Sequence, residues 1–195
     1  MQRKIRWGLL GAGNILHRWM KGVRQVEDME IAAVYSREAE KAAALGKKYG
    51  VKQWETDRQA FLADGSLDFI YVASPNSLHY QWTRDALLAG RNVICEKPFV
   101  STRAELEELV KLAKDRGLFL FEAITVPHLP NFRLLREHLG ELGELKLVQC
   151  NFSQYSSRYQ AFLDGKNPNV FNPQFSGGAL MDINIYNAHF IIGLF

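Results

Sequence analysis

Short apolar runs alternate with helix-like segments through the first two thirds of the chain. Runs bounded in this way by glycine, proline or polar residues are typical of buried parallel strands. We expect strands at residues 5–10, 31–35, 51–54, 67–73, 92–95 and 118–121. Helical patterns lie between them at residues 14–26, 38–49, 57–63, 77–89 and 101–116. This alternation predicts an α/β fold with a doubly wound parallel sheet, a dinucleotide-binding (Rossmann) domain over residues 1–123.

The start of the helix at 101–116 fits two registers. Ser101 can serve as its N-cap, whereas Thr102 with Glu105 can form a capping box one residue later. Gly117 is a stop signal in either register. The sequence leaves the choice open.

The pattern changes near Thr125. Two prolines precede a helical stretch at 131–139, and residues 144–155 have the pattern of one long strand. A polar loop at 165–176 leads to Gly177-Gly178 and a last helical segment. Because one strand cannot make a sheet, we expect residues 124–195 to be an incomplete second domain.

Composition and charge narrow the class of protein. The chain has 195 residues, is 47% hydrophobic and carries a net charge of +3 that no stretch concentrates, so we expect no nucleic-acid partner. Cys95 and Cys150 stand far apart, which argues against a disulfide framework or a zinc site and favours the reducing cytoplasm. The N-terminal apolar stretch is short and broken by glycine, so we expect neither a signal peptide nor a membrane span.

Glu96-Lys97-Pro98 is the most informative motif of the chain. A lysine is costly to bury, yet Lys97 comes directly after an apolar strand. Ligands bind at the carboxyl ends of strands in open α/β sheets. Lys97 is therefore a candidate active-site cation, and we expect Glu96 and Lys97 to line the cofactor site.

A glycine motif follows the first predicted strand. Gly11 and Gly13 allow close approach of a pyrophosphate, and the helix that begins near Asn14 and Ile15 supplies N–H donors. The third glycine of the common fingerprint is replaced by Leu16. The alternative is an ordinary glycine turn, but its place at the first strand favours cofactor binding.

Ser36-Arg37 follows the second predicted strand, where an acidic residue often holds the ribose 2′-hydroxyl of NAD. Glu38 is close but not at the strand end. Serine and arginine suit a 2′-phosphate, so NADP is favoured over NAD. The alternative is that Arg37 and Lys41 only form a solvated helix start.

Ser74-Pro75-Asn76 follows the fourth predicted strand, again at the carboxyl edge. These turn formers can lie along the dinucleotide, or Ser77 can simply cap the next helix. We include His79 among the residues near the cofactor, although its position favours packing over a role as a base.

Asp182, Tyr186 and His189 are spaced so that an α-helix would put all three on one face. Gly177-Gly178 just before them permits a close backbone approach. The alternatives are a buried hydrogen-bonded cluster or a polar outer face.

The order of these motifs resembles the Gfo/Idh/MocA oxidoreductases, in the branch of glucose–fructose oxidoreductase and dihydrodiol dehydrogenase. The resemblance covers essentially the whole chain, and its motifs are Gly11–Ile15, Ser74–His79, Glu96–Pro98, Phe121–Ala123 and Gly177–Tyr186. The sequence departs from the family pattern at Asn184, where many members have glycine, and at His189, where many have aspartate. The chain also ends before the family's usual C-terminus, so we expect a C-terminally truncated member.

The resemblance implies an NAD(P)-dependent dehydrogenase acting on a sugar or polyol, with NADP favoured or NAD as cofactor. Residues 124–195 would be part of an α+β domain with a largely antiparallel sheet, which binds substrate and forms a homo-oligomer when complete. A non-catalytic NAD(P)-binding sensor of the same fold is the alternative.

The resemblance assigns Lys97, Asp182 and Tyr186 to catalysis without a metal, and His189 could complete a proton relay. A free tyrosine has a pKa near 10, and a nearby ammonium lowers it. We therefore expect Tyr186 to be the acid/base and Lys97 the cation that tunes it, while Asp182 holds Lys97 or substrate hydroxyls.

Overall fold

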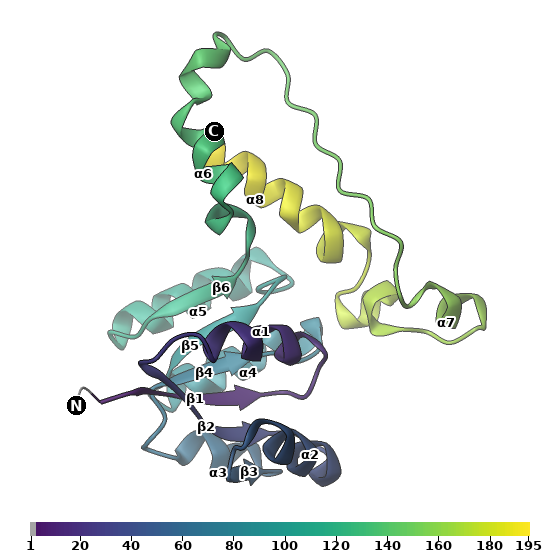
Figure 1. Ribbon diagram of the computed structural model, residues 1–195. Coiled ribbons are helices and arrows are strands. Elements are labelled where there is room, and N and C mark those ends of the chain that lie inside the picture. Colours follow the sequence, from purple (N-terminus) through teal and green to yellow (C-terminus); the bar gives the residue numbers. More distant parts are fainter. Residues whose placement is uncertain (1–2) are drawn as a thin grey trace. The chain divides into compact units, whose positions relative to one another are not determined.

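The computed structural model describes residues 3–195 and divides into two compact units. The first unit ends at Glu122, and the second runs from Ala123 to Phe195. In Figure 1, the colours from purple to teal follow the first unit, and those from green to yellow follow the second.

A six-stranded sheet forms the centre of the first unit, in the order β3-β2-β1-β4-β5-β6. The strands are β1 (Ile5–Leu10), β2 (Met29–Tyr35), β3 (Gln53–Glu55), β4 (Phe69–Val72), β5 (Asn92–Glu96) and β6 (Leu120–Ala123). The four pairs from β3 to β5 are parallel. The predicted doubly wound parallel fold is confirmed, and its chain order reverses between β1 and β4.

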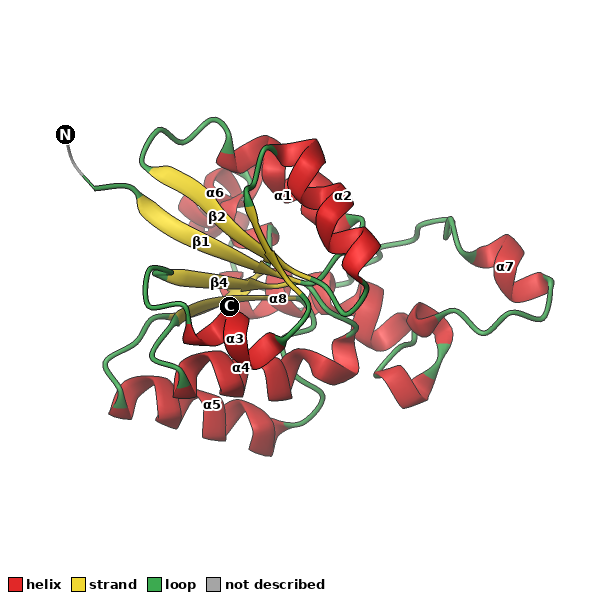
Figure 2. Cartoon of the chain, turned by 90° about the horizontal axis from the view of Figure 1, so that it is seen from below, coloured by secondary structure: helices red, strands yellow, loops and turns green. Residues whose placement is uncertain are grey.

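Helices cover both faces of this sheet. They are α1 (Ile15–Val23), α2 (Ala39–Tyr49), α3 (Arg58–Ala63), α4 (His79–Leu88) and α5 (Arg103–Asp115). Figure 2 shows α1 and α2 on one face and α3, α4 and α5 on the other. The second face holds a continuous apolar core in which Phe61, Trp82 and Leu109 pack against strand residues. These layers hold the strand ends in place.

The structure settles how two of the predicted helices begin. α5 starts after Thr102, whose side chain accepts from Glu105 N–H while the Glu105 carboxylate accepts from Thr102 N–H. Thr102 and not Ser101 is therefore the N-cap, because the capping box satisfies the backbone N–H groups of both Thr102 and Glu105. The predicted helix at 77–89 is a 3-10 turn, Asn76–Leu78, followed by α4, and Ser77 lies inside that turn and caps nothing.

The second unit consists of helices and irregular chain. Its helices are α6 (Pro130–Glu137), α7 (Tyr159–Leu163) and α8 (Ile185–Leu194), with a π-helical turn at Leu180–Asn184. Gly177 approaches the backbone closely, as predicted, since a Cβ there would lie 2.3 Å from the Asn169 carbonyl oxygen.

The strand predicted at 144–155 is wrong. Residues 144–155 form no strand in the structure, and Figure 1 shows them as extended coil between helical segments. The apolar pattern is present, but an extended segment becomes a strand only beside a partner. The antiparallel sheet expected in this part is likewise not seen among described residues 124–195.

Across residues 3–195, none of the helices combines the length and the apolar character needed to cross a bilayer.

Candidate functional site

Four loops leave the carboxyl edge of the sheet side by side. Leu10 pairs with Tyr35 on β2 and with Val72 on β4, and Val72 pairs with Cys95 on β5. The loops after these strands carry the predicted cofactor residues, at 11–15, 36–37, 74–79 and 96–97. The fold thus brings together every position that the sequence predicted for the cofactor site. The edge includes the switch point between β1 and β4, where open α/β sheets bind ligands.

The two glycines of the first loop differ in what the fold demands of them. Gly11 has φ +132°, and a Cβ there would lie 2.4 Å from the Ala73 carbonyl oxygen. The nearest atom to a Cβ on Gly13 is the same oxygen, at 3.7 Å, which is ordinary contact. The fold itself therefore requires Gly11. The exposed backbone at Gly13 is left open for a ligand.

The start of α1 faces the same edge. Asn14 and Ile15 are exposed there, and the Asn14 side chain makes no capping bond. The first turn holds no acidic residue. Helix N–H groups and the positive end of the helix dipole favour an anion, so this end of α1 fits a pyrophosphate. Leu16, at the third fingerprint position, is fully buried in the core.

The loop after β2 uses its serine internally. Ser36 is buried, and its hydroxyl accepts a hydrogen bond from Glu38 N–H at 3.2 Å. The Glu38 carboxylate is paired with Lys41 at 2.7 Å, while Arg37 is exposed beside them. With the nearest acid engaged by Lys41, Arg37 is the residue of this loop best suited to an anionic cofactor group.

His79 lies under the loop after β4 rather than on its surface. It is the first residue of α4 and only 1% exposed. Nδ1 lies 2.7 Å from the Pro98 carbonyl oxygen, and Nε2 lies 3.0 Å from that of Ser74. Ser74, Pro75 and Asn76 are half-buried at the edge above it. A side chain this deeply buried acts on a ligand through these loops and not by contact.

Glu96 is supported by a tyrosine that the sequence reasoning missed. The Tyr71 hydroxyl donates to the Glu96 carboxylate, and the Tyr71 ring stacks on Trp19 with centroids 4.4 Å apart. Burial raises the pKa of Glu96, while the Tyr71 bond opposes that rise. Burial and then Glu96 raise the pKa of Tyr71, so its hydroxyl stays a donor. The available signal was a tyrosine inside an apolar strand, which needs a polar partner.

Lys97 is half-buried and precedes Pro98 through a cis peptide bond. The loop is fixed on its far side by Phe99 N–H, which donates to the Glu122 carboxylate on β6 at 3.1 Å. Lys97 therefore stands on a backbone held by neighbouring elements on both sides. A cation held in this way can act on a ligand at the strand ends.

The remaining candidates belong to the second unit. Asp182 lies in the π-helical turn, whereas Tyr186 and His189 lie in α8. All three are half-buried, and the Tyr186 ring stacks on Phe152 with centroids 5.2 Å apart. The π turn alters the spacing assumed for an unbroken α-helix, so Asp182 is rotated relative to the predicted face. π turns of this kind are frequent at functional sites.

The cysteines and acids of residues 3–195 form no metal site. No group of three or more His, Cys, Asp or Glu side chains in that range is arranged to hold an ion. Cys95 is fully buried, and burial raises the pKa of its thiol. Cys95 is therefore a core residue.

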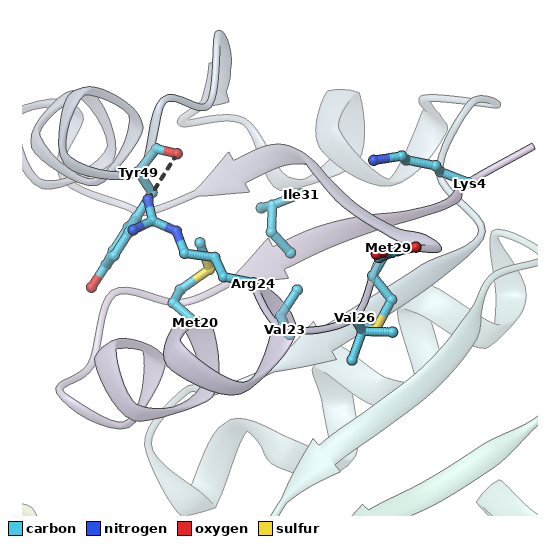
Figure 3. Close-up of a pocket in the computed structure, with 9 residues that line it drawn as sticks. Lys4, Met20, Val23, Arg24, Val26, Met29, Ile31 and Tyr49 are labelled. Atoms are coloured by element: carbon cyan, nitrogen blue, oxygen red, sulfur yellow. Dashed lines mark hydrogen bonds between the residues drawn. The ribbon is translucent and has the colours of Figure 1, made fainter.

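A cavity of about 240 Å³ lies away from these strand ends. Figure 3 shows its lining, which comes from Lys4 before β1, from the end of α1 and the turn after it, from the start of β2 and from Tyr49 at the end of α2. Arg24 and Tyr49 meet at its rim, where the guanidinium bonds to the Tyr49 carbonyl oxygen at 3.5 Å. These residues belong to the opposite edge of the sheet, so the cavity is separate from the candidate cofactor site.

Comparison with known proteins adds an independent line of evidence. Residues 5–124 match the Gfo/Idh/MocA family, described as an oxidoreductase family with an NAD-binding Rossmann fold. The uncharacterized oxidoreductase YgjR of Escherichia coli is 40% identical over 98% of this chain and 58% of its own length. The scyllo-inositol 2-dehydrogenase (NADP(+)) IolU of Bacillus subtilis is 38% identical, with the same coverage of both chains.

A solved structure agrees with the fold. KijD10, a 3-ketoreductase from Actinomadura kijaniata in complex with NADP and TDP-benzene, matches with a TM-score of 0.68 and 31% identity. The match covers 71% of this chain and 43% of that one. The chain thus spans little more than half the length of the curated relatives it matches. Because the family match extends over most of residues 3–195, the chain belongs to the Gfo/Idh/MocA oxidoreductase family with an NAD-binding Rossmann fold.

Proposed function

We propose that this chain is part of an NAD(P)-dependent oxidoreductase that transfers a hydride between nicotinamide and a sugar, polyol or related hydroxyl or carbonyl compound. One observation carries the proposal. The open backbone at Gly13, the acid-free start of α1 and the Lys97 loop all lie at one edge of the sheet. The open backbone at Gly13 and the start of α1 fit an anionic dinucleotide. The Lys97 ammonium can stabilise negative charge on a reacting oxygen.

We propose distinct roles for the residues of the two units. The cofactor, when bound, accepts or donates the hydride. Tyr186 removes the proton from the substrate hydroxyl during oxidation and returns it during reduction. Lys97 stabilises the phenolate and the developing charge on oxygen, because an ammonium favours nearby anions. Asp182 orients Lys97 or substrate hydroxyls, and His189 completes the proton relay or binds substrate.

NADP is the cofactor that we favour. Arg37 is exposed after β2, and the nearby Glu38 carboxylate is paired with Lys41. A guanidinium suits a 2′-phosphate, whereas a free acid there would suit the 2′-hydroxyl of NAD. The name of IolU includes NADP(+), and the KijD10 structure contains NADP, which supports this preference.

We further propose a cytoplasmic protein with no membrane or nucleic-acid partner, which forms a homo-oligomer when its second domain is complete. Cys95 and Cys150 are both free thiols in the structure, which suits a reducing compartment. The alternative of a non-catalytic sensor gains no support from relatives named as dehydrogenases and reductases.

The test is a turnover assay of the complete protein. Reduced and oxidised NADP are offered with a panel of sugars, inositols and dicarbonyl compounds, and nicotinamide absorbance is followed. Lys97→Met is expected to lower kcat by at least about 100-fold with little change in cofactor affinity. Lys114→Met, at an exposed position on α5, is the matched control and keeps full activity.

Two other outcomes have clear meanings. Loss of cofactor affinity alone in Lys97→Met would make this residue a cofactor-positioning lysine. Tight NADPH binding with no turnover of any compound would contradict the oxidoreductase proposal and favour the sensor.

A further inference from the structure

Two loops of the candidate cofactor site are linked by one buried imidazole. The ring of His79 faces the carbonyl oxygen of Pro98 through Nδ1, at 2.7 Å, and that of Ser74 through Nε2, at 3.0 Å. Pro98 follows Lys97 directly, and Ser74 opens the loop after β4. His79 is 1% exposed, the contact to Pro98 is buried, and the contact to Ser74 is partly buried.

This junction extends to the glycine loop. The Ala73 carbonyl oxygen, one residue before Ser74, is the atom that excludes a side chain at Gly11. A shift of the Ser74 backbone would therefore move the Ala73 carbonyl oxygen that packs against Gly11. On the other side, Phe99 N–H is held by Glu122, which limits the freedom of the chain after Pro98. His79 lies between two backbone segments that are otherwise fixed at their far ends.

The chemistry of imidazole restricts what these contacts can be. A neutral ring has one N–H and one lone pair, and a carbonyl oxygen can only accept. The neutral ring can therefore donate to Pro98 or to Ser74, but not to both.

The surroundings favour the neutral ring. Burial lowers the pKa of His79, the two carbonyl contacts oppose this, and the Lys97 ammonium lowers it again. On the neighbouring strand ends, the Glu96 carboxylate accepts from Tyr71, and the Glu122 carboxylate accepts from Phe99 N–H. Buried Cys95 stays a neutral thiol, because burial raises its pKa.

We infer that neutral His79 is a positioning residue for Lys97. The His79 ring donates from Nδ1–H to the Pro98 carbonyl oxygen, and its Nε2 lone pair faces Ser74. Both contacts are within hydrogen-bond distance, and we assign the single proton to Nδ1 because its contact is the shorter of the two. This bond fixes the peptide that follows Lys97 and thereby the origin of the lysine side chain. The part of the inference that concerns catalysis rests on the proposed function.

The protonated nitrogen can be measured directly in the wild-type chain. Nitrogen-15 NMR of imidazole side chains distinguishes the two neutral tautomers, and the chain has five histidines to assign. The signals lost in His79→Asn identify residue 79. We expect the proton on Nδ1, although free neutral histidine prefers Nε2. A proton on Nε2, or on both nitrogens at neutral pH, overturns the inference without reference to activity.

Two variants with amide side chains of different length test the contacts to Pro98 and Ser74 separately. The amide nitrogen of Asn replaces Nδ1, so His79→Asn keeps the bond to Pro98. The longer Gln places its amide near Nε2, so His79→Gln keeps only the contact to Ser74. We expect His79→Asn to retain most of the wild-type kcat. His79→Gln should lose about 100-fold in kcat, the scale of a small misplacement, with a much smaller change in KM for NADPH.

The outcomes distinguish this inference from the proposed function. Equal losses in the two variants, or better turnover by His79→Gln, contradict a positioning bond to Pro98. A complete wild-type protein without turnover contradicts the proposed function, and the tautomer then decides the inference alone.

Discussion

The Tyr71 hydroxyl donates a hydrogen bond to the carboxylate of Glu96, across the boundary between β4 and β5. Glu96 is the residue before Lys97, so this bond fixes the strand end from which the lysine projects. Trp19 stacks on the Tyr71 ring with an angle of 9° between the planes, and this holds the hydroxyl in place. With His79 below Pro98, the Glu96–Pro98 segment is held before and after Lys97.

Tyr71→Phe tests the first of these supports. The variant keeps the ring and its stacking on Trp19 but leaves Glu96, which is half-buried, without its hydroxyl donor. We expect a loss of about 1–3 kcal/mol in the free energy of unfolding at neutral pH, measured by urea denaturation.

The matched control is Tyr80→Phe. The Tyr80 hydroxyl donates to Glu108 at 2.6 Å, but on the solvent-exposed side of α4 and α5. Its removal should leave the free energy of unfolding almost unchanged, because water replaces the lost donor. Equal losses in the free energy of unfolding of Tyr71→Phe and Tyr80→Phe would show that the burial of the Tyr71–Glu96 pair adds nothing to stability.

Arg37→Ala tests the preference for NADP. The guanidinium is expected to contact the 2′-phosphate, which NAD lacks. The dissociation constant for NADPH should rise about tenfold or more, the scale of one charge-assisted bond, while that for NADH stays nearly constant. Fluorescence titration with each cofactor measures both values.

Lys47→Ala is the control for Arg37→Ala. It removes a cation from the last turn of α2, the helix that follows Arg37, and so changes the net charge equally. A similar loss of NADPH affinity in both variants would reduce the effect to general electrostatic attraction.

The sequence predicted the first unit well because each local signal there agrees with the sheet. The glycine at position 11, the apolar run of β4 and the polar residues at 74–76 each mark a strand end, and parallel pairing brings such ends together. The supports from Tyr71 and Glu122 were not predicted, since they depend on the register between strands that are distant in sequence.

The second unit was predicted less well for a physical reason. Residues 144–155 have the apolar pattern of a strand, yet the structure shows no partner strand for them among the described residues. The face expected for Asp182 and Tyr186 assumed 3.6 residues per turn, and the π turn at Leu180–Asn184 breaks that count. Local pattern thus identified the helix but not its winding.

Acidification should destabilise the first unit through His79. Because burial lowers the pKa of His79 below its ordinary value of 6.5, the unfolded chain takes up the proton first as pH falls. The free energy of unfolding should therefore decrease as pH falls below about 6.5, toward the lower pKa of the folded state. In His79→Asn this part of the pH dependence should disappear, as measured by urea denaturation between pH 8 and about pH 5. An unchanged slope in the variant would mean that other groups carry it.

Gly11→Ala and Gly13→Ala should separate a structural glycine from a functional one. At Gly11 the added methyl would lie 2.4 Å from the Ala73 carbonyl oxygen, on a backbone with φ +132°. We expect a loss on the order of 2–4 kcal/mol in the free energy of unfolding of Gly11→Ala.

At Gly13 the atom nearest to an added methyl is 3.7 Å away, so the free energy of unfolding should change by less than about 1 kcal/mol. NADPH affinity should nevertheless fall by about tenfold or more in Gly13→Ala, because the methyl occupies the space for the pyrophosphate. Full NADPH affinity in a stable Gly13→Ala protein would remove this loop from the cofactor site.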